Sequence, residues 1–464
     1  MRIKIVGAAG GEVTGSGYLV QTESASVLID AGMFQGGKKS EAKNRLPPGV
    51  DLSRLNAVLL THAHLDHTGR VPLLIKHGYR GPIFATAPTI DLSEIVLKDA
   101  ARLQAQDAQR MNRMRAYSTD GPVEPLFRPE DVDSFRRLAR CVQFRDEVQV
   151  ARGITACWRE AGHILGSGSI ELTVEERGMS RTLIFSGDLG PRSLPIVREF
   201  EKLGRADVVF LESTYGDRDH KPYAATIAEF EDLIKLAAGT KSKILVPTFA
   251  IGRAQQILYH LAIMFYRQAV APFPVYLDSP MAFAAGKAMV QHADLFDEEM
   301  VEFKSRGLLP LDPKWFHPCV STRESQSLDK VTEPCLILAG AGMCTGGRIL
   351  RHFRENLPRE TTRVLIVGYQ GQGSLGRRLV EGAKSVSVLG EKVSVRSTVH
   401  TLGGFSAHAG QSDLLNWFAP LAASKPNLVL THGEHKPREI LSAVIQRRFG
   451  LPSLLPAQGE VIEI

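Results

Sequence analysis

The fold is decided by the stretch Val58-Leu59-Leu60-Thr61-His62-Ala63-His64-Leu65-Asp66-His67-Thr68-Gly69. Its apolar start predicts a buried strand, which leads into a turn with three histidines and an aspartate within six positions. Zinc accepts imidazole nitrogens and carboxylate oxygens as ligands. One turn with this spacing can present two histidines to one ion and the Asp66-His67 pair to a second. The alternative is a surface loop that is rich in histidine by chance.

The composition is that of a soluble globular protein. Of the 464 residues, 44% are hydrophobic and 23% are charged, and the length predicts two or three domains. No apolar run approaches the roughly 18 residues that a membrane span requires. The segment 1–7 predicts a first strand rather than a signal peptide. We therefore expect a cytoplasmic protein with no membrane partner.

The cysteines and the net charge exclude few further classes of protein. The five cysteines contain no CxxC pair, so we expect reduced thiols and neither a disulfide framework nor a zinc finger. The formal charge of +6 permits a polyanionic partner without requiring one.

The N-terminal third predicts two β-meanders separated by helices. Strands are expected at 4–6, 17–21 and 26–29, then a helix at 71–77, a strand at 82–85, a long helix at 88–117, and strands at 148–152, 154–158 and 168–174. Asp30 ends the third strand beside the expected metal site. It is a candidate to hold a ligand histidine by its other ring nitrogen, and the alternative is an Asx turn that stabilises its own backbone.

Three further residues follow strands or lie in turns typical of ligands. His163 lies in the glycine-flanked turn 161–167, Asp188 follows a strand at 182–185, and Glu212 follows a strand at 207–211 and precedes Ser213-Thr214-Tyr215-Gly216. For His163 alone, the ordinary alternative is a buried structural histidine.

The segment 221–392 changes to repeated units of strand, small-residue turn and helix. Four such units begin at strands near 244, 275, 336 and 364, which predicts a parallel sheet with helices on its faces. Glycine-rich turns that open helices favour anions, because backbone N–H groups and the helix dipole both attract phosphate. Positive charge at the same ends comes from Arg253, Arg348, Arg377 and Arg378.

The last segment again places histidines after strands. His408 lies in the small-residue turn 403–410, after a strand at 398–401, and His432 directly follows the apolar run 428–431. Small residues let a ligand approach the backbone closely. A buried structural histidine is the alternative at each position.

These motifs together resemble a known family. The stretch 62–67 resembles the HxHxDH signature of the metallo-β-lactamase superfamily, and the turns around Glu212, His408 and His432 resemble the three motifs of its nucleic-acid-processing β-CASP branch. The resemblance implies an α/β fold, namely a metallo-β-lactamase αββα sandwich with an inserted parallel-sheet β-CASP domain. We expect the sandwich domain at 1–218, the insertion at 219–393, and the returning part, with RNA-type motifs, at 394–464.

The resemblance also implies a set of site residues. One Zn²⁺ would be bound by His62, His64 and His163, a second by Asp66, His67 and His432, and Asp188 would bridge them; Mn²⁺ suits the same ligands. The nucleophile would be a hydroxide activated by the two ions. His408 would act as the general acid with Glu212 on its other nitrogen, and Asp66 and Asp30 belong to the same catalytic set. Candidate substrate-binding residues are Ser279, Gly342, Met343, Arg348, Ser406 and Ala407.

The implied function is a ribonuclease that hydrolyses single-stranded RNA as an endonuclease, a 5′ exonuclease or both. Histidine at the third β-CASP motif, His432, favours RNA over DNA. The likeness is greatest to bacterial and archaeal relatives of the endonuclease that cleaves eukaryotic pre-mRNA, and more distant to ribonuclease J. The alternatives are a DNA nuclease, a small-molecule metallo-hydrolase, and a non-catalytic scaffold of an RNA-processing complex; a homodimer is left open.

Overall fold

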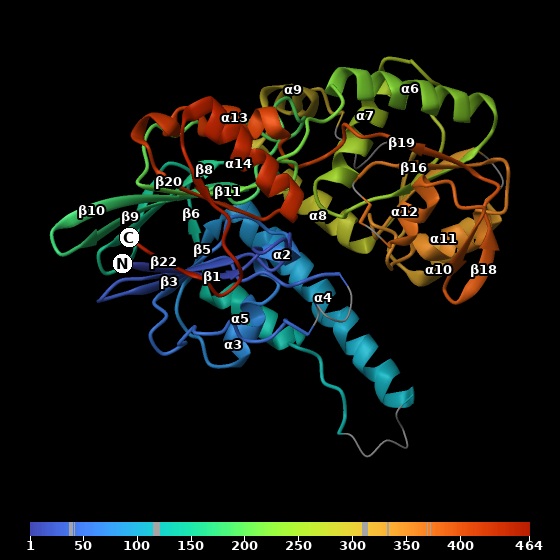
Figure 1. The fold of residues 1–464 in the computed structure, drawn as a ribbon. Helices are drawn as coiled ribbons and strands as arrows, with labels where there is room; N and C mark the ends of the chain where they lie inside the picture. Colours follow the sequence, from blue (N-terminus) through green and yellow to red (C-terminus); the bar gives the residue numbers. More distant parts are fainter. Residues whose placement is uncertain are drawn as a thin grey trace. The chain divides into compact units, whose positions relative to one another are not determined.

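The chain folds into two compact units (Figure 1). The structure, a computed structural model, describes residues 1–36, 40, 42–114, 121–308, 314–331, 334–368, 370–371 and 373–464. Unit 1 comprises residues 1–219 and 408–464, and unit 2 comprises residues 220–407. The sequence placed the return to the first domain at residue 394. The structure keeps 394–407 with unit 2, because β19 (Thr398–Thr401) pairs there with β16 (Thr362–Ile366).

Unit 1 contains two sheets, each of seven strands among the described residues. The first comprises β1 (Arg2–Gly7), β2 (Gly17–Gln21), β3 (Ser26–Ile29), β4 (Ala57–Leu59), β5 (Ile83–Thr86), β6 (Ala139–Val142) and β22 (Val461–Glu463). The second comprises β7 (Glu147–Ala151), β8 (Ile154–Glu160), β9 (Gly168–Glu176), β10 (Met179–Phe185), β11 (Val208–Glu212), β20 (Asn427–Thr431) and β21 (Ser453–Leu454). Their strand orders are β22-β1-β2-β3-β4-β5-β6 and β21-β20-β11-β10-β9-β8-β7.

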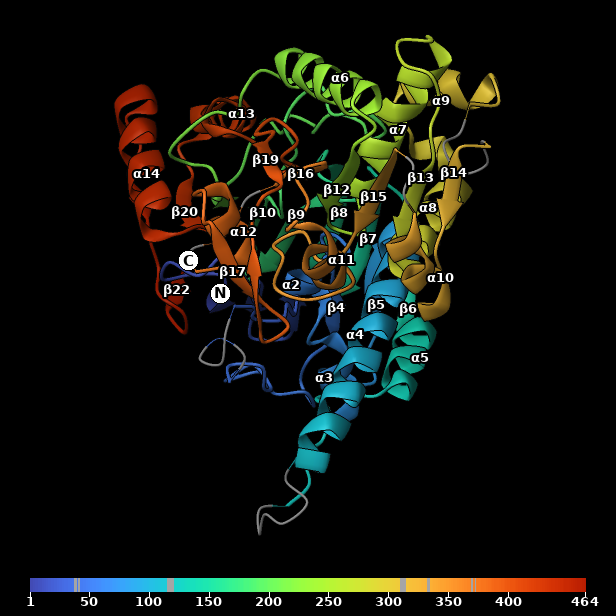
Figure 2. The same ribbon diagram turned by 90° about the vertical axis from the view of Figure 1, so that its right-hand side faces the viewer.

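Helices cover the outer face of each sheet. They are α2 (Leu65–Thr68), α3 (Val71–Lys76), α4 (Ala87–Met114), α5 (Pro129–Leu138), α13 (Gln411–Phe418), η3 (Leu421–Ser424) and α14 (His435–Phe449). The first sheet packs against α3, α4 and α5, which lie together in Figure 2, and the second against α13 and α14. The predicted αββα sandwich is confirmed.

Side-chain alternation along the strands explains these layers. In β3, Val27 and Ile29 point into the core between the sheets, whereas Leu28 points into the core under the helices. A strand buried on both faces is mostly apolar, and all of β3 is buried, with Ser26 its one polar residue. Trp158 of β8 is fully buried in the inter-sheet core, and its indole Nε1 donates to the Leu60 carbonyl at 2.9 Å. This bond ties the second sheet to the chain that leaves β4.

Unit 2 is an α/β domain. Its main sheet has the order β14-β13-β15-β12-β16-β19, with every adjacent pair parallel, as the four strand–turn–helix units predicted. The strands not yet placed are β12 (Lys243–Pro247), β13 (Val275–Asp278), β14 (Phe316–Pro318) and β15 (Cys335–Ala339), and a hairpin of β17 (Ser385–Val388) and β18 (Glu391–Ser394) stands apart.

Helices lie on both faces of this parallel sheet, as its buried strands require. They are α6 (Tyr223–Gly239), α7 (Arg253–Tyr266), α8 (Pro280–Gln291), η1 (Ala293–Leu295), α9 (Glu298–Ser305), α10 (Thr322–Ser327), η2 (Leu328–Lys330), α11 (Ile349–Asn356) and α12 (Leu375–Val380). Ile244 and Val246 of β12 pack toward α6 and α7, and Leu245 between them packs toward α11. The insertion therefore has its own two-sided core.

The long polar helix was predicted at 88–117, and α4 occupies 87–114; the last predicted positions lie outside the described residues. Within the described part of the chain, no helix is both long and apolar enough to cross a membrane.

Glu160, at the end of β8, is a buried carboxylate in unit 1. It is 8% exposed, its Oε1 accepts no hydrogen bond from the described residues, and Arg198 Nη1 lies 3.8 Å away. Burial raises the pKa of Glu160 to about 7, and the nearby Arg198 offsets only part of this rise. The folded protein therefore holds this proton at a pH where the unfolded chain releases it.

We predict that Glu160→Gln stabilises the protein at pH 8 but not at pH 5. A folded-state pKa above the unfolded value destabilises the fold as pH rises between the two, and the wild type should lose about 2 to 3 kcal/mol that the glutamine variant retains. Urea unfolding at both pH values measures this difference. Glu175→Gln, at an exposed position, is the control. An equal effect of Glu160→Gln at pH 5 and pH 8 would contradict the prediction.

Candidate metal centre

The predicted ligands lie at strand ends within unit 1. His62 and His64 follow β4, Asp188 follows β10, and His432 follows β20. Because β10, β11 and β20 are mutually parallel neighbours, their carboxyl ends meet at one edge of the second sheet. His163 reaches this edge from the turn between β8 and β9. The topology thus gathers side chains that are far apart in the sequence.

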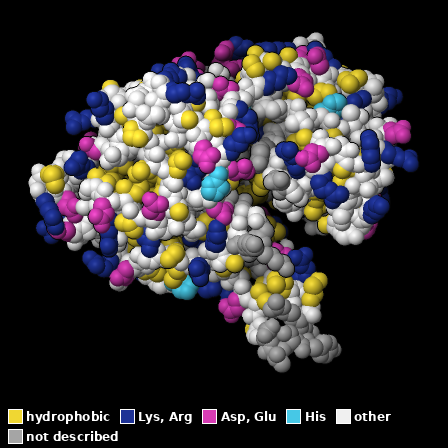
Figure 3. Space-filling view, viewed as in Figure 1, with side chains coloured by type: hydrophobic (Ala, Val, Ile, Leu, Met, Phe, Trp, Pro, Cys, Tyr) yellow, Lys and Arg dark blue, Asp and Glu magenta, His cyan; other side chains and the backbone are white. Residues whose placement is uncertain are grey.

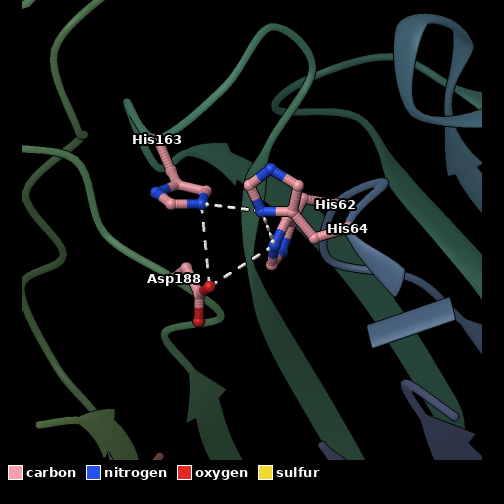
Figure 4. Close-up of side chains that lie close together, drawn as sticks. All are labelled: His62, His64, His163 and Asp188. Carbon is pink, nitrogen blue, oxygen red and sulfur yellow. Dashed lines mark hydrogen bonds and ion pairs between the residues drawn. The ribbon is translucent and has the colours of Figure 1, made fainter. Parts of the chain in front are cut away.

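The first group of potential ligands comprises His62, His64, His163 and Asp188. His64 Nδ1 lies 3.2 Å from His62 Nε2 and 3.1 Å from His163 Nε2. Asp188 Oδ2 lies 3.4 Å from His62 Nε2 and 3.7 Å from His163 Nε2. Figure 4 shows the three rings and the carboxylate turned toward one common point.

The second group comprises Asp66, His67 and His432. The Nε2 atoms of His67 and His432 are 3.2 Å apart, and Asp66 Oδ2 lies 3.7 Å from His432 Nε2. Asp188 contacts this group with its other oxygen, since Oδ1 lies 3.2 Å from His67 Nε2 and 3.5 Å from His432 Nε2. One carboxylate therefore faces both groups, with a different oxygen toward each.

A third group joins Asp188 to Glu212 and His408. His408 Nδ1 lies 3.4 Å from Glu212 Oε1 and 3.9 Å from Asp188 Oδ2. Glu212 is fixed in place, because its two oxygens accept the backbone N–H groups of Leu189 at 2.9 Å and Thr214 at 3.2 Å. The predicted His408 and Glu212 pair is thus adjacent to the ligand groups.

Asp30 directly contacts His67, one of the potential ligands. Its Oδ2 lies 2.7 Å from His67 Nδ1, and its two oxygens also accept the Thr61 N–H and hydroxyl, each at 2.8 Å. These partners lie on another strand end, so the geometry is not that of an Asx turn. The His67 ring is held with Nε2 toward Asp188 and His432.

Two threonines that the sequence reasoning did not single out hold other histidines. Thr61 Oγ1 lies 3.1 Å from His62 Nδ1, and Thr214 Oγ1 lies 3.2 Å from His432 Nδ1. In each pair the ring nitrogen opposite the threonine points into the ligand group. The only signal in the sequence is their position, Thr61 immediately before His62 and Thr214 in the turn after Glu212.

Two site residues adopt left-handed backbone conformations that side chains rarely favour. Asp30 has φ 56° and His432 has φ 51°, and the His432 N–H donates to the Ala8 carbonyl at 2.7 Å. Such a conformation costs about 1 kcal/mol or more for a residue with a Cβ. Hydrogen bonds of the neighbouring backbone maintain this conformation. As a result, the side chains of Asp30 and His432 both turn toward His67.

Burial and neighbouring charges shift the pKa values of the site residues away from their usual values. Burial lowers the pKa of His62 well below its usual value and that of His64 to about 4, which leaves both rings neutral. Burial opposes the ionised form of Asp188, but the surrounding imidazoles, His432 and His67 foremost, hold its pKa well below the usual range. Burial opposes the charged form of His67, but the carboxylates of Asp188 and Asp30 outweigh burial and raise the pKa of His67 well above its usual value. Without metal, the ionised Asp188 therefore lies between the neutral His62 and His64 on one side and the protonated His67 on the other.

The same atoms fit metal ions better than they fit one another. Asp188 Oδ1 is buried and accepts no hydrogen bond from the described residues, although two imidazole nitrogens lie within 3.5 Å. His64 Nδ1 lies within hydrogen-bonding distance of both His62 Nε2 and His163 Nε2 but carries at most one proton, whereas a single cation can be within reach of all three nitrogens. Imidazoles with few carboxylates form the ligand set typical of zinc.

Comparison with known proteins matches this architecture along the chain. The family models for the metallo-beta-lactamase superfamily, the Beta-Casp domain and the Zn-dependent metallo-hydrolase RNA specificity domain match residues 10–80, 254–379 and 392–456. The chain is similar to Ribonuclease TTHA0252 of Thermus thermophilus, with 40% identity over 100% of this chain and 98% of that protein. It therefore belongs to the β-CASP family of the metallo-β-lactamase superfamily.

Other relatives agree with this family. The Transcription termination factor FttA of Pyrococcus abyssi is 29% identical over 100% of this chain and 71% of its own length. Among solved structures, a protein of unknown function from Enterococcus faecalis V583 covers 100% of this chain with a TM-score of 0.56 and 15% identity, which shows likeness of fold alone. The resemblance predicted from the motifs is confirmed, and the chain is a hydrolase of a ribonuclease family.

The candidate substrate-binding residues of this β-CASP protein all belong to unit 2, whereas the ligands belong to unit 1. Ser279 caps α8 by accepting the Ala282 N–H at 3.2 Å, and the Gly342 carbonyl accepts from Gln370 at 2.8 Å. Met343 follows in the same loop, and Ser406 and Ala407 are buried at the end of the unit. Their contact with substrate stays a prediction.

Arg348 is held by contacts within unit 2, and its contact with substrate stays a prediction as well. Its guanidinium donates to Asp278 at 2.7 Å and to the carbonyls of Cys319 and Val320 at 2.8 and 3.0 Å. Asp278 is fully buried and also accepts from His352 and Ser325, each at 2.7 Å. These contacts show that Arg348 links the ends of β13, β14 and α11.

The positive charge is not concentrated on the visible face of the molecule. Figure 3 shows Lys and Arg side chains scattered over this face and interspersed with Asp and Glu. The net charge of +6 therefore adds little by itself to the assignment of a polyanionic substrate.

We predict that Asp30→Ala weakens metal binding about 10- to 100-fold, because the His67 ring loses the carboxylate that orients it and increases its basicity. Competition for Zn²⁺ with a chromogenic chelator measures this change. Asp51→Ala, which removes an exposed carboxylate that binds Ser53, is the matched control. Unchanged Zn²⁺ affinity in Asp30→Ala would show that Asp30 does not orient a ligand.

Proposed function

We propose that this chain is a zinc-dependent ribonuclease that hydrolyses phosphodiester bonds of single-stranded RNA, as an endonuclease, a 5′ exonuclease or both. In this proposal His62, His64 and His163 bind one Zn²⁺, Asp66, His67 and His432 bind a second, and Asp188 contacts both. A cytoplasmic location and a homodimer stay predictions.

The observation that carries the proposal is the position of His408. Its ring lies beside Asp188, which both ligand groups share, and beside the fixed carboxylate of Glu212. Burial lowers the pKa of His408, but the charges of Glu212 and Asp188 outweigh burial and raise it to about 9. A protonated imidazole next to a metal centre is suited to donate a proton to a leaving oxygen. A small-molecule hydrolase of the same superfamily does not account for this pair.

Each part of the site would then have a separate task. Zinc bound at these residues would activate a water and offset the negative charge that develops on the phosphate. Glu212 holds His408 through Nδ1 and stabilises its charged form. His408 donates the proton that the departing ribose oxygen requires. Asp30, Thr61 and Thr214 keep the ligand rings oriented while this charge moves.

RNA is the proposed substrate for two reasons, the comparisons with known proteins and the identity of residue 432. Residues 392–456 match the model described as a Zn-dependent metallo-hydrolase RNA specificity domain, and the similar Thermus protein is named a ribonuclease. His432 stands where the resemblance places histidine in members that act on RNA.

We predict that the zinc-loaded protein cleaves a 5′-labelled single-stranded RNA much faster than the DNA of the same sequence, and faster than the same RNA in a duplex. Removing the metal with a chelator should abolish cleavage, and added Zn²⁺ should restore it, because the nucleophile depends on the ion. Gel analysis of the products distinguishes internal cleavage from release of 5′ mononucleotides. If protein with two equivalents of zinc cleaves neither polymer, the ribonuclease is excluded in favour of a small-molecule hydrolase or a scaffold.

We predict that His408→Ala lowers the rate of RNA cleavage about 10²- to 10⁴-fold, the usual contribution of a general acid. Zinc content should stay at the wild-type level, because the two metal sites have their own ligands. His77→Ala, at an exposed position outside the site, is the control and should cleave at the wild-type rate. Single-turnover cleavage together with zinc content by mass spectrometry separates the two effects. Loss of zinc in His408→Ala would instead make it a ligand.

A further inference from the structure

Arg70 is a buried cation with no acidic partner in the described part of the chain. It is 1% exposed, and no carboxylate among the described residues forms an ion pair with it. Burial lowers the pKa of its guanidinium to about 10, so the group remains charged at neutral pH. A buried charge is costly unless its hydrogen bonds are satisfied. The partners that satisfy Arg70 are main-chain carbonyls and an aromatic ring.

The guanidinium binds two loops that are distant in the sequence. Nε donates to the Gly32 carbonyl, Nη2 donates to the Gly15 carbonyl at 3.2 Å, and the group lies 4.8 Å from the centre of the Phe34 ring. The Arg70 N–H also donates to the Ala31 carbonyl at 2.7 Å. Arg70 itself directly precedes α3 and closely follows the ligand pair of α2.

The same two peptide groups hold the backbone of α2. The peptide that links Gly15 to Ser16 presents its N–H to the Asp66 carbonyl at 2.8 Å. The peptide that links Gly32 to Met33 presents its N–H to the Leu65 carbonyl at 2.9 Å. Each peptide thus accepts from Arg70 on one side and donates to the α2 backbone on the other.

The packing leaves α2 little freedom to shift while these bonds last. A Cβ added to Gly32 would lie 1.5 Å from the Asp66 carbonyl oxygen, so the loop and α2 are in direct backbone contact. The Ala31 N–H donates to the His67 carbonyl at 2.8 Å. In contrast, the Ala161–Ser167 turn that carries His163 is fixed by Ser167, whose Oγ accepts the His163 N–H at 3.1 Å. His163 therefore has a support that does not involve Arg70, whereas His64 directly precedes α2 and its carbonyl accepts the His67 N–H at 3.0 Å.

We infer that Arg70 is a positioning residue for the second metal ion, which it serves by fixing the two peptide groups that hold Asp66 and His67. This inference rests on the two-metal site proposed above. Without the guanidinium, both carbonyls lose their buried donor and the loops that hold α2 relax. The ion bound by Asp66, His67 and His432 should then be held less tightly. The ion bound by His62, His64 and His163 should be less affected, because the two peptide groups donate to Leu65 and Asp66 and not to these histidines.

The test is a stepwise titration of metal-free, full-length protein with Zn²⁺ and with Co²⁺, in the wild type and in Arg70→Met. We expect one of the two equivalents to bind about 10- to 100-fold more weakly in Arg70→Met than in the wild type, as is usual when a ligand loses its support, and the other to change less than about threefold. The Co²⁺ absorption spectrum should lose intensity in the second half of the titration only. Arg70→Lys, which keeps the charge but not the fork of donors, should fall between the two.

Arg438→Met is the matched control. Arg438 is also a buried arginine of unit 1 that binds two main-chain carbonyls, of Leu430 and Pro456, at 3.2 and 2.9 Å. The strand that leads to His432 is paired on both sides, with β11 and β21, so the metal equilibria of Arg438→Met should match the wild type.

Three outcomes would overturn the inference: equal weakening of both equivalents in Arg70→Met, no weakening of either, or the same pattern in Arg438→Met. If Arg70→Met does not fold, Arg70→Lys takes its place and the same outcomes decide. Metal binding is measured without RNA, so a wild type that binds two equivalents but cleaves no RNA refutes the proposed function and leaves this test intact. A wild type that binds a single equivalent refutes both.

Discussion

Asp188 is a buried carboxylate whose negative charge the surrounding side chains of unit 1 stabilise. It follows β10 in the middle of the second sheet, where burial would exclude an ion without partners. The imidazoles on either side hold it in the ionised form, and each of its oxygens faces a different group of histidines. Two metal groups can therefore share one anion, and the close spacing of the groups follows from the width of a single carboxylate.

The scaffold makes this arrangement specific by pairing strands in parallel. Neighbouring parallel strands have their carboxyl ends at the same edge of the sheet. The turns that carry the potential ligands can therefore stay close to the sheets. Trp158 contributes from the opposite sheet, because its bond to the Leu60 carbonyl connects the two layers immediately before His62. The relative placement of the ligand turns thus depends on packing throughout the sandwich.

Much of this site could be predicted from the sequence, because several of its potential ligands lie within one short stretch of the chain. Residues 62–67 carry four potential ligands in one turn, and strand–turn–helix repeats predicted the parallel sheet of unit 2. The contributions of His163, Asp188 and His432 depended on the family resemblance, because no local pattern brings them together. Thr61, Thr214 and Arg70 were not found, since their partners are carbonyls or ring nitrogens contributed by distant loops. The pairing of β19 with β16 was not found either, because it joins segments that are far apart in the sequence.

The order of the ligands along the chain has a consequence for biosynthesis. The group of His62, His64, His163 and Asp188 is complete once residue 188 has been made, whereas His408 and His432 follow the whole of unit 2. Until β20 has been synthesised, β11 lacks its parallel neighbour on that side, and Asp66 and His67 lack their third partner. A nascent chain can therefore assemble one half of the metal centre early but cannot complete it. The full set of potential ligands is present only once residue 432 has been made.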